Sequence, residues 1–196
     1  VFLAVTAEEK GLLGSDYYAS KPLYPLGKTV AVLNMDALDP HGPARNFTTS
    51  GSAKQELLDE LIDTAKKVGN LDYVTDPKPE AGHFFRSDHF PFAKRGVPFI
   101  FAGSGWELAP EKVPNTREPE VGTRYHQPMD EWYPELDFAA AARDIDIYYR
   151  VGQAVANSRG CARNTATSSR GNRTTPSWCR WRGTRSWCRR SSGCLP

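Results

Sequence analysis

The chain has 196 residues, of which 39% are hydrophobic and 24% charged, a composition typical of one globular domain with a buried core. The sequence contains no run of ~18 apolar residues and no secretory signal pattern, so it predicts no membrane-spanning helix and no membrane partner. The formal net charge of +2 hides two unlike parts: residues 1–159 hold 17 basic and all 23 acidic residues, whereas residues 160–196 hold eight arginines and no acid.

The C-terminal segment, residues 160–196, differs from the rest of the chain in composition. It holds all four cysteines and lacks any apolar period, so it cannot build a core. Arginines beside Trp178, Trp181 and Trp187 are compatible with a nucleic-acid-binding arm, and four cysteines allow three disulfide pairings, although no C-x-x-C pair predicts a zinc knuckle. The composition is also typical of a GC-rich gene translated out of frame. We favour this last interpretation and predict no nucleic-acid partner.

The domain division follows from this contrast. Residues 1–157 form the predicted folded part, and residues 158–196 form a tail that we expect to be disordered. In chain order, the first predicted elements are a buried strand, a short helix, a second buried strand and a weaker strand, at Val1–Thr6, Gly11–Ser20, Val30–Met35 and Phe47–Ser50.

A strongly amphipathic helix is predicted next, from Ser52 to Val68, ended by Gly69 and Asn70. Residues 72–82 have a loop composition. The remaining elements are a buried strand, a long irregular segment and a final helix, at Val97–Ala102, Gly103–Arg124 and Asp137–Asn157. Strands that alternate with helices predict an α/β layer fold.

Acidic residues follow two of the predicted buried strands. Glu8 and Glu9 come after the first strand, and Asp36 ends the second. In open α/β sheets ligands bind beyond the carboxyl ends of strands, which places these three acids at the expected rim. The alternative is that Glu8 and Glu9 are solvated acids that favour the start of the following helix.

The four histidines all lie in the first part of the chain. His126 follows the long irregular segment, and a neutral imidazole beside carboxylates is a ligand mixture suited to zinc. Ser87, Asp88 and His89 are adjacent in sequence and therefore cannot form a catalytic triad with one another, so we expect a structural or supporting role. His41 and His83 are interpreted as surface residues.

Four motifs in order, AVTAEEKGLLGSDYYA, NMD, RSDHFPFAKRGVPFIFAG and RYHQPMDEW, resemble metallopeptidase family twenty-eight, the co-catalytic two-zinc aminopeptidases. The resemblance covers about residues 1 to 157. It implies a zinc-dependent exopeptidase fold: a three-layer α/β sandwich whose mostly parallel or mixed sheet is flanked by helices, here incomplete. It also implies two Zn²⁺ ions in the full-length protein and a peptide substrate with a free N-terminus.

The resemblance assigns roles to the rim residues. Glu8 corresponds to the general base, Glu9 and His126 to ligands of one zinc, and Asp36 to a ligand of the other. Ser87, Asp88 and His89 correspond to a motif that lines the active site. The residue that stabilises the oxyanion is left unassigned, because His83-Phe84-Phe85 occupies the stretch where the family often has a donor.

One departure from the family pattern is expected to matter. The family's His-x-Asp segment lies upstream of the double-glutamate motif, and the sequence starts at that motif. Because catalytic zinc usually has three protein ligands, we predict that the chain as written is truncated, binds zinc poorly and is inactive. Alternatives are a glutaminyl-cyclase-like acyltransferase and a catalytically dead, peptidase-like binding domain. Relatives of this type commonly carry export signals, which favours a secreted or periplasmic location.

Overall fold

The computed structural model describes residues 1–36, 38, 42–50, 56–105, 107, 123–134 and 136–158. Four strands form one mixed sheet in the order β1-β4-β2-β3, with β1 parallel to β4, β4 antiparallel to β2, and β2 parallel to β3. The strands are β1 (Val32–Asn34), β2 (Asn46–Thr49), β3 (Asp72–Val74) and β4 (Phe99–Ser104).

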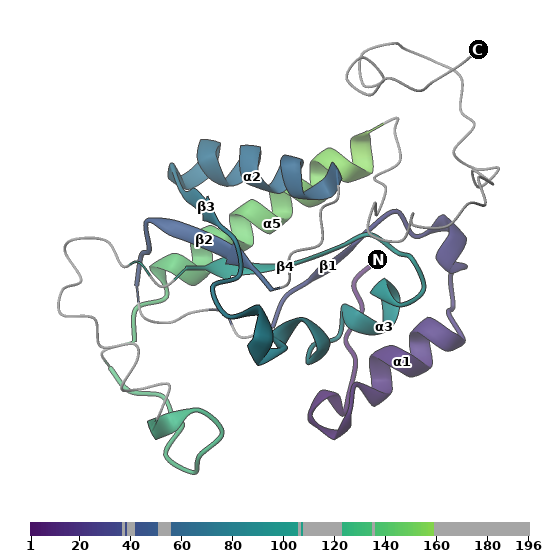
Figure 1. The fold of residues 1–196 in the computed structure, drawn as a ribbon, viewed down its shortest axis with the longest axis horizontal. Coiled ribbons are helices and arrows are strands. Elements are labelled where there is room, and N and C mark those ends of the chain that lie inside the picture. Colours follow the sequence, from purple (N-terminus) through teal and green to yellow (C-terminus); the bar gives the residue numbers. More distant parts are fainter. Residues whose placement is uncertain are drawn as a thin grey trace.

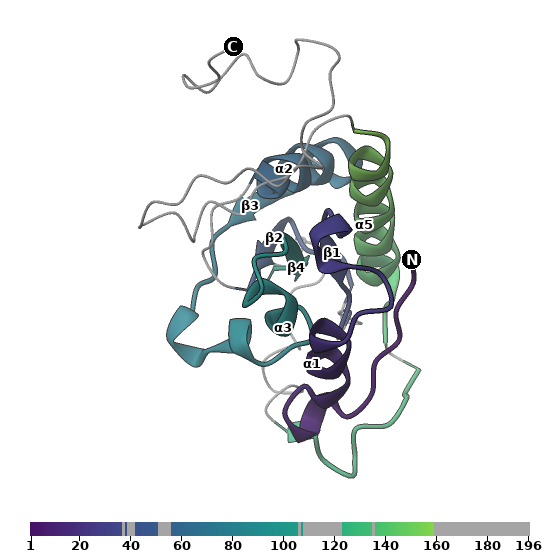
Figure 2. The same ribbon diagram turned by 90° about the vertical axis from the view of Figure 1, so that its right-hand side faces the viewer.

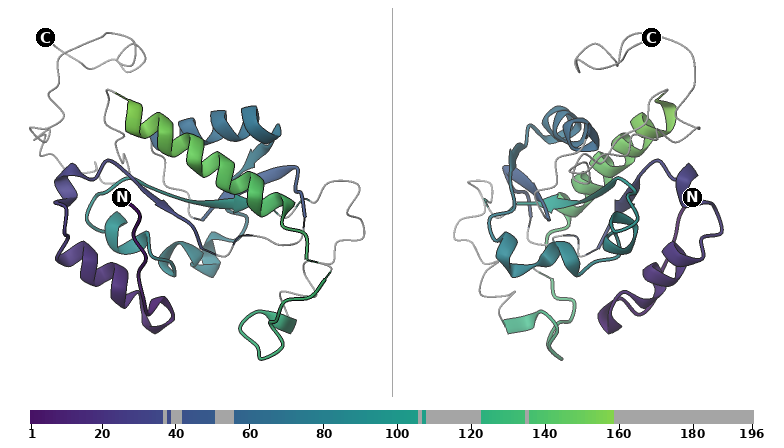
Figure 3. Two further views of the ribbon diagram at one scale, coloured as in Figure 1. Left: turned by 180° about the vertical axis from the view of Figure 1, so that it is seen from behind. Right: turned by 45° about the vertical axis from the view of Figure 1, so that its right-hand side comes forward.

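Helices lie on both faces of this sheet (Figure 1), which confirms the predicted α/β fold with a mixed sheet flanked by helices. Helices α2 and α5 cover one face, and α1 and α3 lie on the other (Figure 1; Figure 3). Their bounds are α1 (Leu13–Ser20), α2 (Glu56–Gly69), α3 (Phe90–Ala93) and α5 (Ala139–Asn157), with short 3-10 turns η1 (Glu8–Lys10), η2 (Leu26–Lys28), η3 (Pro79–Ala81) and η4 (His83–Phe85).

The larger core lies between the sheet and the helices α2 and α5. Successive residues of a strand point to opposite faces of the sheet. Leu33 and Ile100 therefore face this core, whereas Val32 faces α1 and α3. Burial of each large aliphatic side chain in such a core contributes about 1.5–3 kcal/mol. The buried members are Phe47, Leu57, Leu61, Ala65, Leu71, Ile100, Ile147, Tyr148 and Val151.

Helix α2 illustrates how the local sequence determines which face of a helix is buried and where the helix ends. Its apolar residues recur at helical spacing, so that Leu57 and Leu61 are almost completely buried. Asn70 then takes a left-handed conformation with φ of 50°, and the N–H of the buried Leu71 reaches back to the carbonyl of Ala65. This backbone reversal satisfies the last carbonyls of the helix and ends it where the sequence predicts.

The predicted strand at Val1–Thr6 is wrong. Residues 1–6 are irregular, and Val1 and Phe2 are almost fully exposed. A strand needs a partner edge, and in the described sheet this segment has none. It contacts α1 instead, where the N–H of Gly14 donates to the carbonyl of Thr6 at 3.0 Å. β-Branched composition alone therefore does not make a strand.

Smaller differences concern short elements that were not predicted from the sequence. Residues 72–82, expected to be a loop, contain β3 and η3, and the short helix α3 was not anticipated. β3 has an edge position with an exposed–intermediate–exposed burial pattern, so it lacks the continuous apolar run that marks a buried strand. The predicted tail beyond Ser158, the predicted start of the helix at Ser52, most of the segment Gly103–Arg124 and His41 lie outside the described residues.

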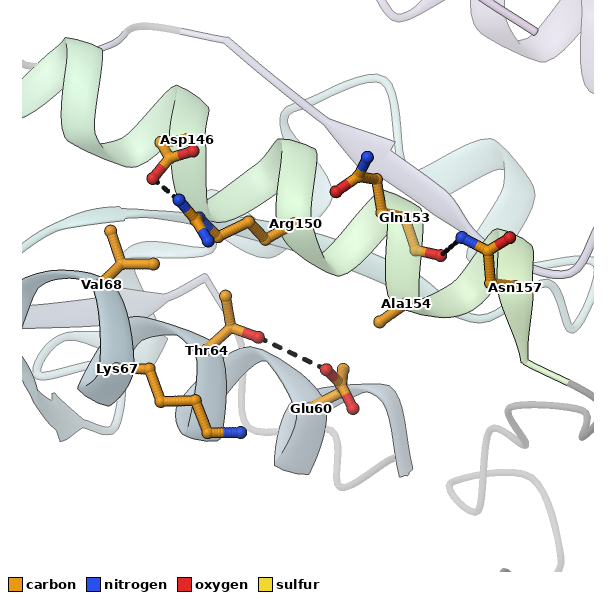
Figure 4. Close-up of a pocket in the computed structure, with 9 residues that line it drawn as sticks. All are labelled: Glu60, Thr64, Lys67, Val68, Asp146, Arg150, Gln153, Ala154 and Asn157. Carbon is orange, nitrogen blue, oxygen red and sulfur yellow. Dashed lines mark hydrogen bonds and ion pairs between the residues drawn. The ribbon is translucent and has the colours of Figure 1, made fainter.

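A shallow groove of about 540 Å³ runs between α2 and α5 (Figure 4). Its polar side chains mostly contact residues of their own helix, as in the pairs Asp146–Arg150 and Glu60–Thr64. None of the residues with predicted site roles lines it. Within the described residues, no helix is both long and apolar enough to cross a membrane.

Candidate functional site

Glu8 and Glu9 lie on a tight turn and not on a strand. Ala7 has φ of 57° and ψ of 41°, a left-handed conformation that is uncommon for a residue with a side chain, and Gly11 has φ of 99°. The N–H groups of Gly11 and Leu12 both donate to the carbonyl of Glu8 at 2.9 Å. Because the chain has already left extended geometry, the two carboxylates need not point to opposite sides as they would on a strand.

Asp36 follows β1, and Ser87 fixes its carboxylate. The Ser87 hydroxyl donates to Asp36 Oδ2 at 2.6 Å and accepts from Asn34 Nδ2 at 2.7 Å. Ser87 is 2% exposed, so this chain of hydrogen bonds is shielded from water at its centre. The segment that precedes α3 is thereby tied to the carboxyl end of β1.

His126 reaches the double-glutamate turn from the segment 123–134. Its Nε2 lies 2.9 Å from Glu9 Oε1, and its ring stacks on that of Tyr125 with centroids 3.9 Å apart. His126 has φ of 60°. Segment 123–134 lies on the same side of the molecule as the start of α1 (Figure 2). Left-handed backbone at both Ala7 and His126 is the kind of local strain that clusters at functional sites.

The electrostatics show which groups lie near one another. Burial raises the pKa of Glu8, and the neighbouring carboxylates of Glu9, Asp36 and Asp88 raise it further, while His126 lowers it. A carboxyl group whose pKa is raised by like charges exchanges protons more readily near neutral pH than an isolated one. Glu8 is therefore the member of the cluster best suited to accept and release a proton.

Tyr125 belongs to the same cluster. Burial raises the pKa of its hydroxyl, and the carboxylates of Glu9, Asp36 and Glu8 raise it further, so the group stays protonated and can donate a hydrogen bond. Tyr125 was not among the residues singled out from the sequence. Its position directly before His126 is the sequence signal that could have placed it in the cluster.

His89 does not face solvent. It is fully buried, and its ring lies against those of Phe99 and Phe101 with centroids 4.9 Å from each. Burial lowers its pKa to about 4, with weaker opposing effects from the Phe84 backbone and Asp36, and neither ring nitrogen makes a hydrogen bond of good geometry. This environment favours a neutral imidazole, and the role expected for the Ser87-Asp88-His89 motif stays a prediction. His83, by contrast, is exposed.

The described side chains are of the types that bind zinc, but too few of them lie together to hold one ion. Carboxylate oxygens and an imidazole nitrogen are ordinary zinc ligands, and Glu9 and His126 already lie within contact of each other. Among the described residues, no three His, Cys, Asp or Glu side chains lie close enough to hold one metal ion. The described residues therefore bring together a two-ligand pair, with Asp36 held separately by Ser87.

An α/β sheet with carboxylates and a histidine gathered on the turns beside it is compatible with a hydrolytic site that takes a metal ion. The model of peptidase family M28 matches residues 1–149, and the chain belongs to this family of zinc-dependent metallopeptidases. No curated protein and no solved structure gave a significant match to the chain.

The hydrogen bonds of Ser87 are expected to stabilise the fold as well as to orient Asp36. Ser87→Ala removes the acceptor of the partly buried Asn34 amide and one hydrogen bond to Asp36, so we expect the free energy of unfolding to fall by about 1–3 kcal/mol. Urea unfolding of the metal-free protein measures this loss. Ser158→Ala removes a hydroxyl whose hydrogen bond to the Val155 carbonyl is exposed to solvent, so it serves as the control and should change stability by less than about 0.5 kcal/mol. An equal effect of both substitutions would contradict this role of Ser87.

Proposed function

We propose that this metallopeptidase is a zinc aminopeptidase, in which Glu8 is the general base and Glu9, His126 and Asp36 are zinc ligands. The observation that carries the proposal is the 2.9 Å contact between Glu9 and His126, two residues far apart in sequence that meet beside Glu8. Zinc held there would supply the Lewis acidity that polarises a scissile carbonyl.

Each residue of the cluster has a distinct part in this proposal. Glu8 takes a proton from the attacking water and passes it to the leaving amine, a transfer that its raised pKa favours. The Tyr125 hydroxyl, which stays protonated, donates a hydrogen bond to the oxygen on which negative charge develops. Ser87 keeps the Asp36 carboxylate oriented.

Charge supports an exopeptidase that acts on a free N-terminus. Glu8, Glu9, Asp36 and Asp88 lie close enough for their charges to interact, which makes the site strongly acidic. An α-ammonium group is attracted to the part of this negative charge that bound zinc would leave uncompensated, whereas a blocked N-terminus gains nothing from it. We therefore propose peptides with a free α-amino group as substrates, and a secreted or periplasmic location remains a prediction.

We further propose that this chain alone holds zinc weakly and hydrolyses peptides slowly or not at all, because among the described residues two ligands meet where catalytic zinc usually has three. The test is calorimetric zinc titration of the wild type, Glu9→Gln and His126→Ala. We expect weak binding by the wild type and at least about tenfold weaker binding by both variants. His83→Ala, at an exposed histidine with no proposed zinc role, should bind like the wild type.

Activity is measured with excess zinc on leucine p-nitroanilide and its N-acetylated form. We expect any zinc-dependent hydrolysis to be confined to the free amine. Equal cleavage of both compounds would contradict the aminopeptidase proposal. Cyclisation of an N-terminal glutamine without peptide cleavage would favour the acyltransferase alternative, and peptide binding that depends neither on zinc nor on a free amine would favour the binding-domain alternative.

A further inference from the structure

The two edges of strand β4 are paired differently. One edge pairs with β2 from Ala102 to Ser104, in the register Thr49↔Ala102 to Phe47↔Ser104. The other edge pairs with β1, whose last registered pair is Asn34↔Phe101. Past this pair β1 has ended, but the backbone of β4 continues for three more residues and its polar groups still need partners.

Helix α5 supplies these partners with two side chains. The Tyr148 hydroxyl accepts from the N–H of Ala102 at 2.7 Å and donates to the carbonyl of the same residue at 2.9 Å. The Asp144 carboxylate accepts from the N–H of Ser104 at 2.7 Å and from the Ser104 hydroxyl at 2.8 Å. Both α5 side chains are more than nine-tenths buried.

The spacing of helix and strand makes this substitution possible. Tyr148 and Asp144 are four residues apart on α5, a rise of about 6 Å. Ala102 and Ser104 are two residues apart on β4, a rise of about 6.7 Å. One face of the helix can therefore serve two successive polar positions of the strand edge, as a neighbouring strand would.

The groups that α5 occupies are those that Asp36 would use. In a parallel ladder that continued in the register of Asn34↔Phe101, the N–H of Asp36 would donate to the carbonyl of Ala102. The carbonyl of Asp36 would accept from the N–H of Ser104. These are the carbonyl and the N–H that Tyr148 and Asp144 take.

We infer that Tyr148 and Asp144 are positioning residues that end the β1–β4 ladder at Asn34 and thereby hold Asp36 out of the sheet, where its carboxylate meets Ser87. Burial raises the pKa of Tyr148, which keeps its hydroxyl protonated and able to donate to Ala102. Arg143 completes the arrangement, because its Nη2 donates to the Ser104 hydroxyl at 2.9 Å and lies 3.5 Å from Asp144 Oδ1. The inference rests on the proposed function only where it treats Asp36 as a zinc ligand.

The test compares Tyr148→Phe with Tyr149→Phe. The first substitution keeps the ring and removes the hydroxyl that caps Ala102. The second removes an exposed hydroxyl on the same helix whose partner is Gln153. In Tyr148→Phe we expect amide hydrogen exchange of Ala102 to accelerate by at least about tenfold, a shift of the Asp36 carboxyl carbon resonance at fixed pH, and about tenfold weaker zinc binding. Tyr149→Phe should leave all three within about twofold.

A second comparison separates positioning from a purely structural role. If Tyr148 acts through Asp36, Tyr148→Phe should weaken zinc binding no further in a chain that already carries Asp36→Asn. An additive loss, or faster Ala102 exchange with an unmoved Asp36 resonance, would overturn the inference. Should Tyr148→Phe fail to fold, Asp144→Asn is measured in its place. A wild type that binds no zinc would contradict the proposed zinc site, and the Asp36 resonance would still decide the positioning role.

Discussion

Glu8→Gln is expected to remove whatever zinc-dependent peptide hydrolysis the wild type retains in excess zinc, because glutamine cannot accept the proton that Glu8 takes from water and loss of a general base costs about 10²–10⁴-fold in rate. Zinc affinity should stay within a few-fold of the wild type, since Glu9 and His126 retain their contact. Turnover of leucine p-nitroanilide in excess zinc measures the loss. Glu80→Gln, an exposed glutamate on η3, is the matched control and should retain wild-type turnover. Substantial turnover by Glu8→Gln would exclude Glu8 as the base.

At neutral pH, Glu8→Gln should make the folded metal-free chain more stable, although it lowers activity. Burial and the nearby carboxylates raise the pKa of Glu8 above its ordinary value of 4.5, so its ionised form is disfavoured in the folded metal-free chain. Its unfavourable contribution appears as pH rises from 4.5 through the raised folded pKa. At neutral pH, Glu8→Gln should therefore unfold at a higher urea concentration than the wild type, and this advantage should vanish below pH 4.5. A less stable variant at neutral pH would contradict the crowding of carboxylates around Glu8.

Acid should destabilise the protein through His89 by up to about 3 kcal/mol between pH 7 and pH 4. The folded-state pKa of His89 is about 4, against 6.5 for an ordinary histidine, because the buried ring disfavours a charge. Stability from a histidine with a depressed folded pKa is fully present above pH 6.5 and is lost as pH falls through 6.5 toward 4, where the unfolded chain takes up the proton first.

Urea unfolding of the wild type and His89→Leu at several pH values isolates this contribution, since all other titrating groups are common to both. Leucine suits the surrounding rings of Phe84, Phe99 and Phe101 and carries no proton. We expect the wild type to lose up to about 3 kcal/mol more than His89→Leu over this pH range. His83→Leu should follow the wild-type profile because His83 is exposed. Parallel profiles for the wild type and His89→Leu would show that His89 takes up its proton without opening the core.

Several features of this protein are decided by residues close together in the chain. The apolar spacing of α2 and α5 determines which helix faces are buried, and the left-handed Asn70 ends α2 where the sequence predicts. The apolar runs around β1 and β4 determine these two strands, and the alternation of their residues assigns side chains to the two faces of the sheet. The four ordered motifs identify the peptidase family, because each motif lies within one short segment of the chain.

Strand pairing and contacts between residues distant in sequence could be known only from the tertiary structure. Val1–Thr6 has strand composition but no edge to pair with in the described sheet, so propensity alone predicted it wrongly. Asp36 could be proposed from its place after β1, but its partner Ser87 and the cap that Tyr148 places on Ala102 come from segments that only folding brings near. Likewise, the spacing of Glu9 and His126 in sequence says nothing of their 2.9 Å contact. Local patterns determine elements and motifs, whereas hydrogen bonds between remote segments determine how the site is assembled.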